Sequence, residues 1–133
     1  MSHFTTVETK IKNMNLLKRI LKELGYAFTE VTDEQQVKVK GYQGQTTDAN
    51  LVIHASKTYD IGVRMTEKGA TFIADWWGVE TTRGVTEEEF IHQLVQKYSY
   101  HTVMDAVQAK GYTVQEEEVA EDQTIKIKIK GWS

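Results

Sequence analysis

Histidine is the residue most often found in metal sites and acid–base catalysis, and the chain has four: His3, His54, His92 and His101. No two of them are spaced four apart, the helical spacing that places two metal ligands on one face. A site assembled from separate strands stays open, but lone histidines are more typical of surface or hydrogen-bonded positions. We therefore predict no metal site and no cofactor.

Carboxylates near the expected strand ends form a second group: Asp48, Asp60 and Asp75. Acid–base catalysis by carboxylates needs two of them close together in different environments, and the spacing in this sequence does not establish that. Asp75 stands out because it directly precedes Trp76 and Trp77 in an apolar segment. It is either an outward-facing aspartate paired with a neighbouring Lys or Arg, or part of a ligand site.

The Trp76–Trp77 pair is the most informative dipeptide. We read residues 70–77 as a strand, in which adjacent side chains point to opposite faces. Phe72 shares the face of Trp76, so we assign Trp76 to the core and Trp77 to the outer face or a pocket rim. Tryptophan is enriched among the residues that dominate protein interfaces. A ligand or partner site would then involve four residues: Asp75, Trp77, Tyr98 and His101.

Lysines alternate along two expected strands and define a possible nucleic-acid face: Lys38, Lys40, Lys126, Lys128 and Lys130. If the two strands were neighbours, these side chains would cover one sheet face and could follow a single-stranded nucleic acid. The alternative is an ordinary solvent-facing sheet surface, and we favour it because the net charge of −3 gives no attractive field for a polyanion. The run Glu116–Glu118 is similarly read as a solvated strand edge.

Hydrophobic periodicity predicts an α+β fold with a mostly antiparallel sheet and helices packed on one of its faces. Asn13 and Thr86 are expected N-caps, Thr86 with Glu89 as a capping box, and Gly25 is expected to close the first helix. The expected strands cover 3–12, 26–31, 37–40, 51–55, 59–64, 70–77, 112–119 and 124–130, the expected helices 14–24 and 87–110, and the expected loops 41–48 and 78–84.

The two ends of the chain resemble each other. Gly25-Tyr26 matches Gly111-Tyr112, and the segment 38–42 matches 128–132. Each half reads strand–helix–strand–strand, which suggests a pseudo-twofold repeat. Coincidence is the equal alternative, because helix–glycine–aromatic–strand is a common arrangement.

Composition is typical of a globular protein: 133 residues, 40% hydrophobic and 26% charged. We expect one domain spanning 1–133. The chain has no cysteine, which excludes disulfides, thiolate metal sites and cysteine nucleophiles. We expect neither a signal peptide nor a membrane span. No nucleotide-binding glycine motif or nucleophile elbow is present.

Five segments together resemble one family, the small conserved hypothetical reading-frame family of cyanobacteria and algal plastids, classed as a domain of unknown function. They are SHFTTV at 2–7, GYQGQT at 41–46, YDIG at 59–62, ADWWGV at 74–79 and YHTV at 100–103. The resemblance covers nearly the whole chain. It implies a cytoplasmic setting, or the plastid stroma in algal relatives, and it implies no reaction and no catalytic residue.

We therefore expect a non-enzymatic binding protein with a protein partner, acting as an accessory or assembly factor in photosynthetic cells. The first alternative is a small-ligand-binding protein or an enzyme, with a site around Asp75, Trp77, Tyr98 and His101. The second is single-stranded nucleic-acid binding on the lysine face, which we regard as the weaker interpretation.

Overall fold

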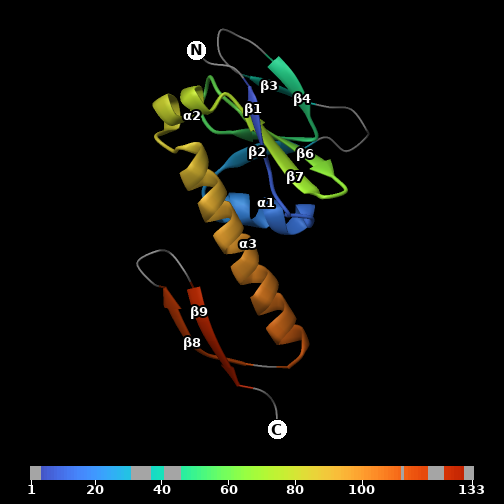
Figure 1. Ribbon diagram of the computed structural model, residues 1–133, viewed down its shortest axis with the longest axis vertical. Coiled ribbons are helices and arrows are strands. Elements are labelled where there is room, and N and C mark those ends of the chain that lie inside the picture. Colours follow the sequence, from blue (N-terminus) through green and yellow to red (C-terminus); the bar gives the residue numbers. More distant parts are fainter. Residues whose placement is uncertain (1–3, 31–36, 41–45, 112, 120–124, 131–133) are drawn as a thin grey trace.

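The structure is a computed structural model that describes residues 4–30, 37–40, 46–111, 113–119 and 125–130, with side chains described for 4–30 and 49–111. Figure 1 shows the arrangement of its elements. The strands are β1 (Thr5–Glu8), β2 (Ala27–Glu30), β3 (Val37–Lys40), β4 (Thr46–Ala49), β5 (Leu51–His54), β6 (Ile61–Thr66), β7 (Gly69–Ala74), β8 (Thr113–Val119) and β9 (Ile125–Lys130). The helices are α1 (Met14–Glu23), α2 (Trp76–Arg83) and α3 (Glu87–Ala109).

The main sheet has five strands in the order β1-β7-β6-β5-β2, and every pair in it is antiparallel. Among the described residues, β3 with β4 and β8 with β9 form two further antiparallel pairs. This confirms the predicted α+β class and its antiparallel sheet. The hairpin of β8 and β9 lies beside the C-terminal half of α3, away from the main sheet (Figure 1).

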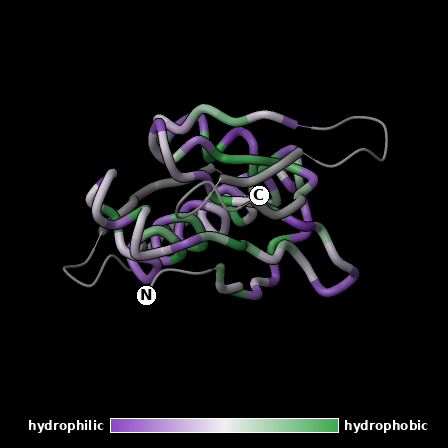
Figure 2. The backbone as a smooth tube through the Cα atoms, turned by 90° about the horizontal axis from the view of Figure 1, so that it is seen from above, coloured by the Kyte–Doolittle hydropathy of each residue, from purple (hydrophilic) through white to green (hydrophobic). Residues whose placement is uncertain are grey.

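The core lies between one face of the main sheet and the three helices. Because alternate strand residues share a face, Ile53, Ile61 and Phe72 point to the same side. They join Leu17 of α1 and Phe90 of α3 in one buried cluster. Figure 2 shows the backbone coloured by hydropathy, with hydrophobic segments gathered toward the middle and hydrophilic turns at the periphery. Burial of this face therefore fixes how the helices sit on the sheet.

The first helix forms as the sequence predicts. The Asn13 side chain accepts a hydrogen bond from the backbone N–H of Leu16 at 3.1 Å. At the other end Gly25 has φ of +83°, and its N–H donates to the carbonyl of Lys22 while Tyr26 N–H donates to that of Leu21. This pair of bonds is the Schellman closure that a left-handed glycine permits. The predicted N-cap and glycine stop are confirmed.

The strand predicted over 70–77 is wrong at its C-terminal end, and the loop predicted over 78–84 is also wrong. β7 ends at Ala74, and Trp76–Arg83 form α2. The Asp75 side chain caps this helix by accepting from Gly78 N–H at 3.2 Å, and Gly84 closes it with φ of +81°. Asp75 is 1% exposed, so the interpretation of Asp75 as an outward-facing aspartate paired with Lys or Arg is wrong. The capping residues were visible in the sequence, but two helical turns are too short for a clear apolar period.

Two further expectations need correction. Residues 46–49 form β4, although 41–48 was predicted as a loop; residues 41–45 lie outside the described part of the chain. The described residues do not show the suggested repeat, because β2 pairs with β5 whereas β8 pairs with β9. The predicted helix over 87–110 is confirmed as α3, which runs unbroken for 23 residues.

The lysine strands do not lie side by side. β3 and β9 belong to separate two-stranded sheets, so the condition for one five-lysine face is not met. The register of β8 and β9 also places Glu116 opposite Lys128 and Glu118 opposite Lys126. Strand pairing therefore does not bring Lys38 and Lys40 onto one sheet with Lys126, Lys128 and Lys130.

Candidate functional site

An apolar groove of about 910 Å³ lies where the first turns of α2 and α3 meet β1. Its apolar lining comes from all three elements: Val7, Trp76, Trp77, Ile91 and Val95. The polar lining comes from the two helices: Glu80, Thr86, Glu87, Glu88 and His92. Pockets that are mostly apolar with a few polar groups at the rim are typical of binding sites.

The two tryptophans differ in exposure, as the sequence predicted. Trp76 is 8% exposed and its ring centroid lies 6.0 Å from that of Phe90, whereas Trp77 is 56% exposed. The reason differs from the predicted strand alternation. Successive residues of a helix are rotated by about 100°, so the first turn of α2 directs Trp76 into the core and Trp77 to the groove. Trp77 therefore presents a large aromatic surface to solvent.

The groove is acidic. Among the described residues that line it, three are glutamates (Glu80, Glu87 and Glu88) and none is Lys or Arg. Glu87 and Glu88 lie in the first turn of α3, which the capping box of Thr86 and Glu89 begins. Acidic residues at this end stabilise a helix through its dipole, so they would be favoured without any partner. Their position beside Ile91 and Val95 nevertheless makes the groove both apolar and negatively charged.

The other three predicted site residues lie elsewhere. Asp75 caps α2. The Tyr98 hydroxyl accepts hydrogen bonds from the backbone N–H of Asn13 at 3.1 Å and of Lys12 at 3.3 Å. His101 Nε2 lies 3.0 Å from Glu23 Oε2. Tyr98 and His101 thus join α3 to the two ends of α1, and of the four predicted residues only Trp77 is among the described residues lining the groove.

Asp75 gives a first testable prediction. Its Oδ1 caps α2, while its Oδ2 is buried without a hydrogen bond among the described residues. We expect Asp75→Ala to lower the free energy of unfolding by about 0.5–2 kcal/mol, as loss of an N-cap does. Asp75→Asn keeps the acceptor and removes the charge, so it should be at least as stable as the parent protein. Urea denaturation of both variants checks this, and equal losses would show that the charge, not the cap, matters.

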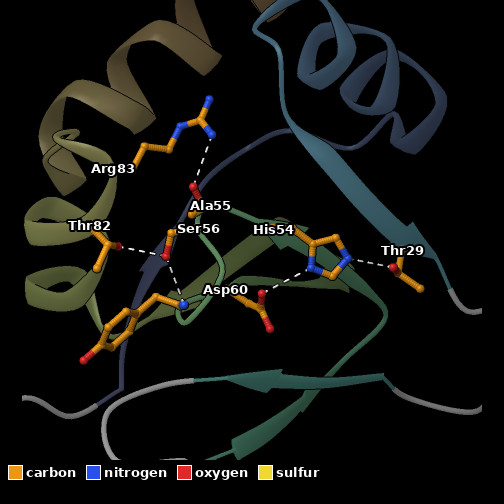
Figure 3. Close-up of polar contacts among 8 residues, drawn as sticks. Thr29, His54, Ala55, Ser56, Asp60, Thr82 and Arg83 are labelled. Carbon is orange, nitrogen blue, oxygen red and sulfur yellow. Dashed lines mark hydrogen bonds and ion pairs between the residues drawn. The ribbon is translucent and has the colours of Figure 1, made fainter.

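A polar network joins α2 to the turn between β5 and β6 (Figure 3). Arg83 Nη1 donates to the carbonyl of Ala55 at 3.1 Å, and the hydroxyls of Thr82 and Ser56 are hydrogen-bonded to each other at 2.8 Å. Ser56 Oγ also accepts from Tyr59 N–H at 3.1 Å. The network holds this turn in place, and the turn positions Asp60.

Beyond this turn, His54 lies between Thr29 and Asp60 (Figure 3). The sequence analysis named His54 and Asp60 separately and did not connect them. Their spacing of six residues could have connected them, because a short hairpin places residues at this spacing opposite each other. Thr29 could not have been found in this way, because its strand lies 25 residues away. Within the described residues, no group of three or more potential metal ligands gathers in one place.

Fold and groove together define a small α+β protein with an exposed tryptophan in an acidic, apolar groove. The chain belongs to the family described as "Protein of unknown function (DUF1257)", whose model matches residues 20–128. This confirms the resemblance to a family of unknown function with relatives in algal plastids.

The relatives are similar along their whole length. "Uncharacterized protein ycf35" of Guillardia theta is 33% identical, with 99% of this chain and 98% of the relative covered. The protein of the same description from Cyanophora paradoxa is 31% identical over the same shares, and that from Pyropia yezoensis is 26% identical over 100% of this chain and 99% of the relative. These relatives are encoded in algal plastid genomes. No solved structure matches the chain. In the described part of the chain, no helix is long and apolar enough to cross a bilayer.

Proposed function

We propose that this protein acts by binding another protein, as an accessory or assembly factor in photosynthetic cells. The observation that carries the proposal is Trp77, which is 56% exposed at the edge of an apolar groove. A large exposed aromatic side chain beside an apolar groove is the usual form of a protein-interaction hot spot. The protein's setting in this proposal is the cytoplasm, or the stroma in algae, and the plastid-encoded relatives support the stromal setting.

The chemistry of the groove selects the partner. Ile91 and Val95 offer an apolar surface one turn apart on α3, and Val95 is 40% exposed. Glu80, Glu87 and Glu88 place negative charge around that surface. The complementary occupant is a protein segment that inserts an apolar side chain next to Trp77 and carries Lys or Arg on its flanks. Exposed charges of this kind act mainly on association rate and specificity.

A peptide selection tests this proposal. Peptides selected from a random library on the intact protein should be enriched in Lys or Arg next to Leu, Ile or Phe. Trp77→Ala should weaken their binding by about 30-fold, which corresponds to a hot-spot loss of about 2 kcal/mol. Glu87→Gln with Glu88→Gln should flatten the salt dependence of binding. Fluorescence anisotropy of labelled peptides measures both effects.

The matched control is Val103→Ala, because Val103 is an exposed apolar residue of α3, 46% exposed, and is not among the described groove residues. It should leave peptide affinity unchanged. Enrichment of acidic peptides, or peptides that bind the Trp77→Ala and parent proteins equally well, would contradict the proposal.

A further inference from the structure

We propose that Thr29, His54 and Asp60 form a nucleophilic site, in which the Thr29 hydroxyl accepts an acyl group from an activated ester or thioester. The residues are not among the described lining of the groove, and the inference is independent of the proposed binding function. It adds a chemical activity to a protein that the sequence led us to expect to be non-enzymatic.

The three side chains form a row: Thr29 and His54 lie on the neighbouring strands β2 and β5, and Asp60 directly precedes β6. β2 pairs with β5 and β5 with β6, and the register sets Ala27 opposite His54 and Ile61 opposite Ile53. Thr29 is therefore the diagonal neighbour of His54 on one side, and Asp60 is the next position along the ladder on the other. Thr29 Oγ1 lies 2.7 Å from His54 Nε2, and His54 Nδ1 lies 3.2 Å from Asp60 Oδ1 (Figure 3).

The order of these contacts is the order that activates a hydroxyl. A carboxylate only accepts hydrogen bonds, so the neutral imidazole that faces Asp60 with Nδ1 donates its Nδ1–H there. In that tautomer Nε2 carries the lone pair, which faces the Thr29 hydroxyl and can take its proton. A buried carboxylate, an imidazole and a hydroxyl in this sequence of contacts perform nucleophilic catalysis on several unrelated folds. The row therefore has the geometry of a nucleophile with its base and the base's orienting group.

Burial divides the three residues in the way that such chemistry needs. Asp60 is 1% exposed, so water does not compete strongly for its contact with His54. The His54 side chain is 38% exposed, and Thr29 is exposed on β2, which is an edge strand of the main sheet. An acyl donor can thus reach the hydroxyl. The turn that carries Asp60 is held by Thr82 and Arg83 of α2, which preorganises the row.

The step balances as an acyl transfer. The Thr29 hydroxyl proton moves to His54 Nε2 while Oγ1 bonds to the acyl carbon, and the bond from that carbon to the leaving oxygen or sulfur breaks. The leaving group takes the proton from Nε2, giving O-acyl-threonine and a free alcohol or thiol. Water can then hydrolyse the ester, with His54 as its base. Because a threonine alkoxide is a poor leaving group, acyl-threonine should accumulate when the donor is strongly activated.

The test uses the full chain and p-nitrophenyl acetate. Mass spectrometry should locate an acetyl group on Thr29, formed about 100-fold faster than on Thr102. Thr102 is the matched control because its exposed hydroxyl donates to the Tyr98 carbonyl instead of facing an imidazole. His54→Gln and Asp60→Asn should slow acetylation of Thr29 by about 100-fold or more. Thr29→Ser should still be labelled. The parent protein should release an initial burst of p-nitrophenolate, and Thr29→Val should abolish it.

Three results would overturn the inference. They are acetylation restricted to lysines or to His54, labelling of Thr29 at the rate of Thr102, and a burst that persists in Thr29→Val. If Thr29→Val or Asp60→Asn instead lowers stability while the parent protein shows no selective labelling, the row serves only to join β2 to the sheet. Circular dichroism of each variant establishes that it is folded before its labelling is compared.

Discussion

Trp76→Ala is expected to lower the free energy of unfolding by about 3–5 kcal/mol, the range for truncating a large core side chain. Trp76 is 8% exposed and packs in the core with Phe90, whose ring also meets those of Tyr26 at 5.4 Å and Phe72 at 5.9 Å. Trp77→Ala should cost less than about 1 kcal/mol, because more than half of Trp77 is already in water. Urea denaturation followed by circular dichroism gives both values.

Trp76→Phe separates packing from hydrogen bonding in this prediction. Trp76 Nε1 is buried without a hydrogen-bond partner among the described residues, so phenylalanine removes no hydrogen bond known there and keeps most of the aromatic volume. Its cost should be well below that of alanine. Equal and severe losses in Trp76→Ala and Trp77→Ala would show that Trp77 is a core residue, and the groove would then lose its anchor.

Gly69→Ala is expected to destabilise the protein by about 2–5 kcal/mol, from backbone strain and overpacking together. Gly69 begins β7 with φ of +136°, a conformation that residues with a side chain rarely adopt. A Cβ atom there would collide with the backbone carbonyl oxygen of Thr9 and lie 2.9 Å from Lys10 Cα. Backbone atoms cannot rotate away as a side chain can, so the segment that follows β1 would have to move away from β7. Thermal or urea denaturation measures the loss.

Gly84→Ala is the matched control for Gly69→Ala. Gly84 also has a positive φ, +81°, but a Cβ atom there meets nothing within 4 Å. Its replacement should cost only the backbone penalty of about 1–2 kcal/mol. If Gly69→Ala were no more harmful than Gly84→Ala, the close approach of the chain at 9–10 to the start of β7 would be wrong.

Local rules in the sequence account for much of the fold. Asn13 and Gly25 bound α1, and Thr86 with Glu89 begins α3, because each satisfies backbone groups that a helix end leaves unpaired. Apolar alternation, together with short apolar segments bounded by turns, located the described strands except β4, whose segment Thr46–Ala49 is largely polar. These signals act within a few residues, so no knowledge of distant contacts is needed to read them.

The candidate sites depend on contacts between distant parts of the chain. The sequence named Trp77 as the outward tryptophan, but the groove exists only because α2 turns back against α3 and β1. The sequence analysis placed Asp75 in a strand, whereas the structure places it at the N-cap of α2, and the next residue, Trp76, packs against Phe90.

By itself, the sequence determined the fold class, the boundaries of the long elements, the different exposure of the two tryptophans and the family. Only the tertiary structure decided that β3 and β9 lie in different sheets, that Tyr98 and His101 join α3 to α1, and that Thr29, His54 and Asp60 meet. The physical reason is one of range. Helix caps and apolar periodicity depend on residues a few positions apart. Strand order and contacts between distant side chains depend on how the helices and strands bury one shared core.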